Sequence, residues 1–344
     1  MGEAYVLGMD IGGTATRAVV LDLDGRRCGT GLAGGGNPTS HGPQAAASSL
    51  TTALSAALAG LAPARVAAAA VGLAGAGRLV ADPQARAAFD TAWREAGLRC
   101  GYTVHGDAVA AYAAGTCEPD GTVLIAGTGA IAAAVRDLRL ARVADGHGWL
   151  LGDEGSGFWL GRAAVRRALA VCDGRVPDGP LTRAVRKHLL GGHSNGSSPP
   201  GAAAAGGRWA ATARETASAL VQAVAAHPPV ALAALAPLVM AACDEADPAA
   251  HDLVQEAADR LCRTVALVRG PDETTPVVIA GGLLTAATPL AAAVRERLAS
   301  GWPAAPVRPA GDAAAAAAWL AARTLPGVDA PALHSRFLAA APTG

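Results

Sequence analysis

Two short glycine-rich segments at equivalent places along the chain carry the residue types needed to hold an anion. The first follows a predicted strand and contains Asp10, Gly12, Gly13, Thr14 and Thr16. Glycine lets backbone N–H groups approach an anion because no Cβ stands in the way, and threonine hydroxyls can donate to phosphate oxygens. Asp10 can hold Mg²⁺ through water, because this ion keeps much of its hydration shell. An ordinary hairpin turn explains the segment equally well when it is considered alone.

The second segment, Gly127-Thr128-Gly129, lies between two further predicted strands. Two such turns in the same setting are less expected by chance than one, so together they predict a phosphate site. Neither segment matches the Walker A pattern or the dinucleotide fingerprint. A third pair, Gly281 and Gly282, joins a predicted strand to a helix and leaves room for the adenine or ribose of a nucleotide, although packing alone also explains glycines at such a junction.

One carboxylate has the position expected of a general base. Asp107 follows a predicted strand and begins a helix, in the segment His105-Gly106-Asp107-Ala108. Aspartate is a favourable N-cap, and that role explains the residue when it is considered alone. The functional hypothesis is that Asp107 accepts the proton of an attacking hydroxyl, as phosphoryl transfer requires.

Two further segments carry polar residues suited to a hydroxylated ligand. Asp153 and Glu154 are flanked by glycines just before a predicted helix, in a stretch that begins with Gly146 and His147. A helix cap explains one of these carboxylates but not the pair, and both can accept hydrogen bonds from sugar hydroxyls. Asn37, in a turn between a strand and a helix, can donate to and accept from a sugar hydroxyl or an acetamido group.

Hydrophobic patterns predict the same order of strands and helices in both halves, βββαβαβα, with a helical insertion at about 154–270 in the second half. The repeated order indicates a duplicated α/β topology. The predicted strands lie at 4–9, 16–22, 27–32, 66–73, 102–105, 123–126, 131–136, 138–144, 276–280 and 306–308, and the main predicted helices outside the insertion at 44–61, 83–97, 107–117, 283–298 and 312–323.

A chain of 344 residues is long enough for two domains, each with its own core. We predict an N-terminal domain at 1–117, a C-terminal domain at 118–325 that contains the insertion, and a tail at 326–344. The segment 191–207, rich in Gly, Ser, Pro and Ala, predicts a surface loop within the insertion.

Composition excludes several classes of partner. The 28 basic and 28 acidic residues balance, so there is no electrostatic reason to expect nucleic acid or an acidic membrane. The six cysteines form no C-x-x-C pair and suit buried small residues in a reducing compartment. No signal peptide or membrane-span pattern is recognised. These features predict a soluble, cytoplasmic protein that acts on a small molecule.

Taken together, the motifs resemble the N-acetylglucosamine kinases of the BadF/BadG-type ATPase family, within the actin–hexokinase–Hsp70 superfamily. The resemblance covers about 6–323, and its most discriminating part is the G-x-G-x-x-x-G-D-E-G-S stretch that starts at Gly146. It implies two ribonuclease H-like domains that flank an ATP cleft, with Asp107 as catalytic base. It also implies that the two turns embrace the ATP phosphates, that Gly281 and Gly282 lie by the nucleoside, and that the sugar is surrounded by Asn37, Asp107, Gly146, His147 and Asp153.

The resemblance implies a homodimer that uses ATP and Mg²⁺ to convert N-acetylglucosamine to N-acetylglucosamine 6-phosphate. Four positions depart from the family pattern. The family often has Gly in place of Ile11, Lys in place of Ala15 and Ser in place of Ala130, and it often has Trp or Gly near His147. The first three changes concern contact with ATP, and the fourth concerns the choice of sugar.

Several alternatives remain open at this point. The acceptor could be glucosamine, N-acetylmannosamine, N-acetylmuramic acid or another sugar. Activator ATPases of 2-hydroxyacyl-CoA dehydratases share the superfamily but hold an iron–sulfur cluster with closely spaced cysteines. Repressor–sugar kinase proteins carry a zinc-binding cysteine cluster, which this sequence lacks. A silent sugar sensor is the alternative without catalysis, and the presence of Asp10, Asp107, Asp153 and Glu154 argues against it.

Overall fold

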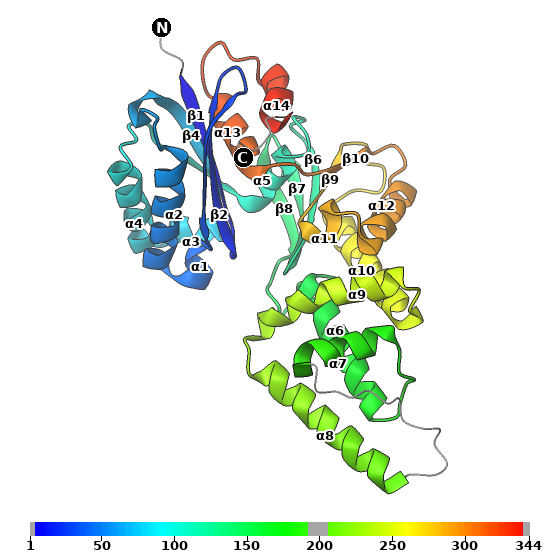
Figure 1. The fold of residues 1–344 in the computed structure, drawn as a ribbon. Coiled ribbons are helices and arrows are strands. Elements are labelled where there is room, and N and C mark those ends of the chain that lie inside the picture. The colour runs from blue at the N-terminus through cyan, green and yellow to red at the C-terminus, as the bar shows by residue number, and fades with distance from the viewer. Residues whose placement is uncertain (1–3, 192–205, 340–344) are drawn as a thin grey trace.

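Two five-stranded sheets of identical strand order form the centre of the molecule (Figure 1). The computed structural model describes residues 4–191 and 206–339. Sheet A has the order β3-β2-β1-β4-β5 and sheet B the order β8-β7-β6-β9-β10, so the predicted duplicated α/β topology is confirmed. The strands are β1 Tyr5–Ile11, β2 Ala15–Asp22, β3 Arg27–Gly34, β4 Val66–Leu73, β5 Thr103–Gly106, β6 Gly121–Ala126, β7 Ala130–Arg136, β8 Arg139–Asp145, β9 Val277–Ala280 and β10 Val307–Pro309.

The alternation of side chains along β1 separates the two faces of sheet A. Leu7, Met9 and Ile11 are buried in the core cluster that includes α2 (Pro43–Ala57) and α4 (Pro83–Glu95). Gly8 and Asp10 point to the opposite face, because successive residues of a strand alternate. This second face turns toward sheet B, so the residue at the end of β1 is directed toward the space between the sheets.

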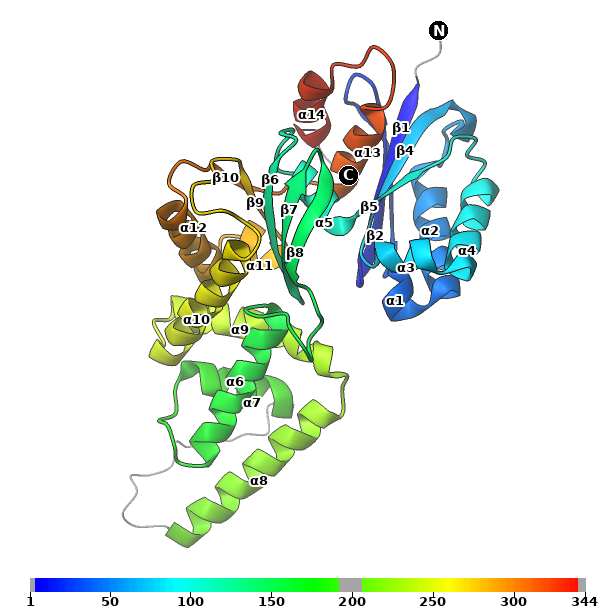
Figure 2. The same cartoon turned by 180° about the vertical axis from the view of Figure 1, so that it is seen from behind.

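Each half of the chain contributes one helix that packs against the sheet of the other half. Helix α13 (Ala313–Ala322) comes from the second half but packs on β1 and β4 of sheet A, whereas α5 (Asp107–Ala113) contacts β6 and β9 of sheet B as well as α13 (Figures 1 and 2). A Cβ on Gly8 would lie 2.0 Å from the carbonyl oxygen of Ala314, so only glycine allows this close approach. An all-alanine face on α13 and a glycine on β1 therefore bring the helix directly onto the sheet.

The helical insertion extends away from sheet B and packs on the sheet through α10, while α6 packs on α10 and on the other helices of the insertion (Figure 2). Two of these helices begin at a side-chain cap: Ser156 caps α6 by accepting the Trp159 N–H, and Asp247 caps α10 by accepting from Ala249 and Ala250. The described helices of this region are α6 Gly157–Cys172, α7 Pro180–Leu190, α8 Gly206–Ala225, the 3₁₀ helix Pro229–Leu235, α9 Ala236–Asp244 and α10 Pro248–Ala266.

The helices outside the insertion differ from the predicted ones in several places. The helix predicted at 283–298 is split into α11 (Gly282–Thr285) and α12 (Pro289–Gly301), because Thr288 and Pro289 supply a new cap and first turn. Two short helices, α1 (Pro38–His41) and α3 (Ala76–Ala81), were not predicted.

The predicted tail contains the helix α14 (Ala330–Ala339), whose Leu333 and Phe337 are buried in the core between the sheets. Most of the predicted loop at 191–207 lies outside the described residues. Within the described part of the chain, no single helix is long and apolar enough to cross a membrane. One pair, Thr212–Ala225 with Pro229–Asp244, passes the same test jointly but is bent by 112°.

Candidate active site

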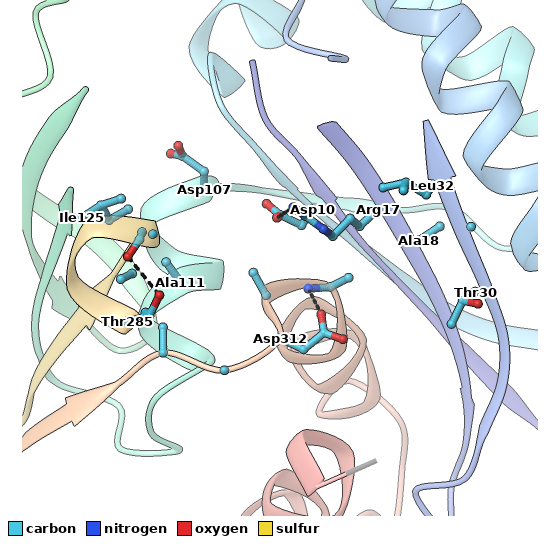
Figure 3. Close-up of a pocket in the computed structure, with 18 of the residues that line it drawn as sticks. Asp10, Arg17, Ala18, Thr30, Leu32, Asp107, Ala111, Ile125, Thr285 and Asp312 are labelled. Carbon is cyan, nitrogen blue, oxygen red and sulfur yellow. Dashed lines mark hydrogen bonds and ion pairs between the residues drawn. The ribbon is translucent and has the colours of Figure 1, made fainter. Parts of the chain in front are cut away.

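A cavity of about 820 Å³ opens between sheet A, α5, α13 and the strand-to-helix junction after β9. Its wall carries both acidic and basic groups and the paired glycines of the third predicted motif (Figure 3). The residues at issue are Asp10, Arg17, Arg27, Asp107, Gly281, Gly282, Thr285 and Asp312. The structure therefore brings together four of the predicted site residues, Asp10, Asp107, Gly281 and Gly282, and adds charged residues that were not predicted.

Asp10 stands next to the last residue of β1, and Arg17 is its partner across the antiparallel β1–β2 ladder. The Arg17 guanidinium lies 3.7 Å from the Asp10 carboxylate, and 58 % of the Arg17 side chain is exposed. Burial raises the pKa of Asp10 to about 6, with Arg17 opposing the rise and the nearby charges of Asp107 and Asp312 adding to it. A carboxylate in this environment gains from a bound cation, which fits the predicted role in holding Mg²⁺.

Asp107 begins α5 immediately after β5 and faces the same cavity as Asp10 (Figure 3). The N-cap position belongs to Gly106, so capping is not the main role of the aspartate. One Asp107 carboxylate oxygen accepts the Ala108 N–H at 2.9 Å. Burial raises the pKa of Asp107, although backbone N–H groups oppose the shift. A raised pKa makes this carboxylate a stronger proton acceptor.

Two side chains that were not predicted complete the charged wall. Arg27 on β3 donates to Asp312 at 2.6 Å, and its side chain is only 8 % exposed. Asp312 also caps α13, because it accepts the N–H groups of Ala314 and Ala315. The ion pair thus ties the edge of sheet A to the helix contributed by the second half. Asp312 before a run of alanines is an N-cap signal that can be recognised in the sequence. Its pairing with Arg27 cannot be recognised there, because the two residues are far apart in sequence.

The first glycine turn is open to solvent at its tip. Gly13 and Thr14 are exposed, and the Gly12 N–H donates to the Ala15 carbonyl at 2.9 Å. Thr16 lies elsewhere: it is fully buried in β2, and a Cβ on Gly36 would lie 2.5 Å from its hydroxyl oxygen. Among the described residues the Thr16 hydroxyl has no hydrogen-bond partner. A phosphate contact through Thr16 would require the segment at Gly36 to move.

The second glycine turn is held on several sides. The Gly127 N–H donates to the Gly129 carbonyl at 2.9 Å. The carbonyls of Gly127 and Thr128 accept the first N–H groups of α6, from Gly157 at 2.8 Å and from Phe158 at 3.1 Å. Because these carbonyls point at the helix, the turn and the start of α6 form one rigid unit.

The predicted sugar-binding carboxylates make specific contacts of their own. Asp153 is 9 % exposed, and its carboxylate accepts the Ala130 N–H at 3.0 Å. Burial raises the pKa of Asp153; Ala130 and His147 oppose the rise, and Asp145 adds to it. Glu154 forms an ion pair with Arg260 of α10, whose guanidinium also lies 4.9 Å from the centre of the Trp159 ring.

The remaining predicted sugar-binding residues lie in loops. The Asn37 side-chain oxygen accepts the Thr39 N–H at 2.8 Å, so its acceptor is used as the cap of α1. Gly146 has a φ of +73° and donates its N–H to the Ala130 carbonyl at 3.0 Å, and His147 is exposed. The structure does not place these residues in the wall of the cavity around Asp10.

Asp145, at the end of β8, was not among the predicted site residues. Its two carboxylate oxygens accept the N–H groups of Asp153 at 2.7 Å and Glu154 at 2.8 Å. An aspartate followed by glycine is a turn signal in which the carboxylate often bonds nearby backbone, so Asp145-Gly146 offered a clue.

The described residues contain no cluster of metal ligands and no disulfide. Within residues 4–191 and 206–339, no group of three His, Cys, Asp or Glu side chains could hold a metal ion. The magnesium prediction therefore depends on Asp10. All six cysteines are free thiols and are half-buried, whereas buried positions were predicted.

Comparison with solved structures gives relatives over nearly the whole chain. A protein from Chromobacterium violaceum, provisionally named an N-acetylglucosamine kinase, is 27 % identical, with a TM-score of 0.67 over 92 % of this chain and 99 % of that one. A Porphyromonas gingivalis protein with the same provisional name is 24 % identical, with a TM-score of 0.61 over 86 % and 90 % of the two chains.

A third structure shares the fold at lower identity. A glucokinase of the ROK family from Streptomyces griseus, solved with glucose and AMPPNP, is 21 % identical, with a TM-score of 0.52 over 93 % of this chain and all of that one. The sequence has no match among curated proteins. The family model described as the BadF/BadG/BcrA/BcrD ATPase family matches residues 7–321. This match spans both sheets and the residues of the cavity, and the chain belongs to the BadF/BadG/BcrA/BcrD ATPase family.

Proposed function

We propose that this protein transfers the γ-phosphoryl group of ATP to a hydroxyl of an amino sugar, with N-acetylglucosamine as the preferred acceptor and its 6-phosphate as the product. The observation that carries the proposal is the meeting of Asp10 and Asp107 in one cavity between two sheets of the same topology. Family membership supports the use of ATP. The provisional name of the Chromobacterium violaceum protein supports the class of acceptor.

In this reaction Asp107 acts as the general base. The sugar O6 forms a bond to the γ-phosphorus, the bond from that phosphorus to the β–γ bridging oxygen breaks, and the O6 proton passes to the Asp107 carboxylate. The other product is ADP. Burial raises the pKa of Asp107, which favours this proton transfer. Positioning and charge stabilisation supply most of the remaining catalysis in phosphoryl transfer.

Asp10 is the residue proposed to hold Mg²⁺, mainly through water. The ion would neutralise charge on the phosphate oxygens when it is bound. The Asp10 side chain is 24 % exposed, so its carboxylate is accessible from the cavity. Burial and the nearby charges of Asp107 and Asp312 disfavour the ionised form of Asp10, and a bound cation would offset that cost.

Arg17 is proposed as the cation that meets the phosphates. The cavity is lined by three aspartates and two arginines, so a polyphosphate needs a positive partner there. Arg27 is already bound to Asp312, whereas Arg17 is exposed and holds Asp10 only at 3.7 Å. An exposed ion pair of this kind contributes about 0–1 kcal/mol, so Arg17 can turn to a phosphate at little cost. Arg17 would thereby supply the positive charge that a lysine often supplies in the family at the position of Ala15.

The backbone N–H groups of residues 13–14 and 128–129 are proposed to approach the phosphates, with Gly281 and Gly282 beside the nucleoside. The N–H groups of Gly12 and Gly127 already donate within their own turns, so these two glycines would shape the turns instead. The sugar would be held by Asn37, Gly146, His147, Asp153 and Glu154. Asp153 and Glu154 keep further acceptor capacity beyond their present bonds, because an ionised carboxylate offers about four lone-pair sites. The Asn37 amide N–H groups can donate to the acceptor.

The test is ADP release by the full chain with Mg²⁺-ATP and a panel of N-acetylglucosamine, glucosamine, N-acetylmannosamine, N-acetylmuramic acid and glucose. We expect the highest kcat/KM with N-acetylglucosamine and phosphorylation at O6, identified by NMR of the product. A higher kcat/KM for another sugar would assign that sugar as the acceptor and would still support a sugar kinase. ADP release that ignores every sugar would favour an activator-type ATPase, and no ADP release with intact sugar binding would favour a sensor.

Two structural features belong to the same proposal. We propose a division into domains at 1–117 and 118–325, and assembly as a homodimer. Light scattering coupled to size-exclusion chromatography tests the dimer: a mass near twice 33.8 kDa is expected, and a mass near 33.8 kDa would refute it.

A further inference from the structure

The acceptor loop, residues 146–155, is joined to the second glycine turn through a single residue. Ala130 follows that turn at the start of β7, and both of its backbone polar groups are taken by the loop region. Its N–H donates to the Asp153 carboxylate at 3.0 Å, and its carbonyl accepts the Gly146 N–H at 3.0 Å. Both ends of the acceptor loop are therefore bonded to Ala130.

Asp145 fixes the loop from the opposite side. Its carboxylate accepts the backbone N–H groups of Asp153 and Glu154, so one side chain holds the two consecutive residues that carry the loop's carboxylates. Asp145 and Asp153 both have positive φ, +63° and +58°. Non-glycine residues adopt this region at some energetic cost, and the hydrogen bonds of Asp145 help to hold it.

Asp153 is also in direct contact with the turn itself. A Cβ on Gly129 would lie 2.7 Å from an Asp153 carboxylate oxygen, so the carboxylate rests directly on the turn. The carbonyls of this turn also accept hydrogen bonds from the first residues of α6. Asp145, the loop, Ala130 and the turn therefore form one hydrogen-bonded unit that spans the proposed sugar and phosphate positions.

We propose that Asp145 is a positioning residue that couples the two substrates: a sugar bound in the acceptor loop strengthens nucleotide binding at residues 127–129 through Asp145 and Asp153. This inference rests on the proposed sugar kinase function. When two sites share one structural unit, the ligand that orders the unit for itself also orders it for the other ligand. By linkage the nucleotide strengthens sugar binding by the same factor.

The experiment is isothermal titration of the full chain with Mg²⁺-AMPPNP, with and without saturating acceptor sugar. For the unmodified protein we expect the sugar to lower the nucleotide Kd by about fivefold or more, the usual lower limit of site coupling. Asp145→Asn keeps a residue that tolerates positive φ but loses one acceptor oxygen. It should reduce the ratio to less than about twofold, with the Kd for nucleotide alone nearly unchanged.

Two further variants make the result specific. Asp145→Gly removes both acceptors without backbone strain, so it should also abolish the coupling while the protein stays folded. Asp137→Asn is the matched control, because Asp137 also has positive φ (+49°) and precedes the other end of β8. It should keep the full ratio.

The outcomes separate this inference from the proposed function. A protein that phosphorylates the sugar while Asp145→Asn and Asp145→Gly keep the normal ratio overturns the inference alone. Loss of nucleotide binding without sugar in both variants would assign Asp145 to building the turn and would also overturn the coupling. An unmodified protein that neither binds nor phosphorylates any sugar of the panel overturns both proposals.

Discussion

The two glycine turns occupy the same place in sheets of the same strand order, yet they are held in different ways. Turn 12–14 has an exposed tip, and the ring of His41 donates to the Gly13 carbonyl at 2.7 Å. Turn 127–129 has its carbonyls bonded to the start of α6 and Asp153 resting against Gly129. Thr128 at the tip of the second turn is exposed as well, and the Gly12 carbonyl of the first turn accepts the Gly36 N–H at 3.1 Å. The two turns therefore differ mainly in the contact of Asp153 with Gly129, because a Cβ on Gly13 would meet no atom within 4 Å.

This difference teaches that duplication of a backbone does not duplicate its chemical role. Two of the three carboxylates of the cavity, Asp10 and Asp107, come from the first half, together with the exposed Arg17. The second half contributes Asp312 and the glycines after β9, while its own turn supports the acceptor loop. We therefore expect substitutions in the first half to affect chemistry and ATP contact, and those at the second turn to affect structure as well.

The largest effect is expected at Asp107. Asp107→Asn removes the proton acceptor, so kcat should fall by about two orders of magnitude or more, the usual scale for a general base. Steady-state ADP release measures it. Asp82→Asn is the control, because Asp82 also stands at the start of a helix, where asparagine caps equally well, and it lies outside the cavity wall. Near-normal turnover in a folded Asp107→Asn protein would refute the assignment.

The comparison of the turns is sharpened by one matched pair of substitutions. Gly129→Ala places a Cβ against Asp153 and should destabilise the protein by about 1–3 kcal/mol, as overpacking does, and lower kcat/KM as well. Gly13→Ala meets no atom within 4 Å, so it should leave the melting temperature unchanged and raise only the KM for ATP. Equal thermal unfolding of the two variants would contradict the distinction.

A smaller effect on stability is expected at Asp10, with a defined pH dependence. Its pKa is raised to about 6, so its ionised form is less favourable in the folded protein than in the unfolded chain. The contribution of Asp10 to the free energy of unfolding is therefore most stabilising at low pH, and it declines as pH rises from about 4 to 6. Without ligands, Asp10→Asn should gain about 3 kcal/mol at pH 7 and less than about 1 kcal/mol at pH 4.

Denaturant unfolding at both pH values measures this change. The same variant should lose most Mg²⁺-ATP turnover, because the proposed ligand of the ion is gone. A variant that is less stable than the unmodified protein at pH 7 would contradict the burial argument for Asp10.

The smallest effect is expected at Arg17. Arg17→Ala should raise the KM for ATP by about tenfold and lower kcat less, because loss of one charged phosphate contact costs about 1.4 kcal/mol. Arg17→Lys should recover part of the affinity. Arg26→Ala is the control, since Arg26 is an exposed arginine at the β2–β3 hairpin that pairs with Asp22. An unchanged KM in Arg17→Ala would remove Arg17 from the phosphate site.

Prediction from sequence was most successful where the signal was local. The order of strands, the strand-to-helix position of Asp107 and the glycine turns follow from hydrophobic patterns and turn residues, and the structure has these elements where they were predicted. The split after Thr285 was missed because Pro289 starts a new helix where the periodic pattern continues. The side-chain partners of Asp153 and Glu154 were also missed, because Ala130 and Arg260 are distant in sequence.

The sequence by itself determined the duplicated α/β order, because periodicity is a property of short segments, and residue type singled out the carboxylates that are proposed to do chemistry. Only the tertiary structure decided which of them meet. Asp10, Arg17 and Asp107 share a cavity because β1, β2 and α5 converge there, while Asp153 and Thr16 are turned to internal contacts. The physical reason is that pairing of distant backbone and packing of α13 on Gly8 set these directions, and neither is encoded in local pattern.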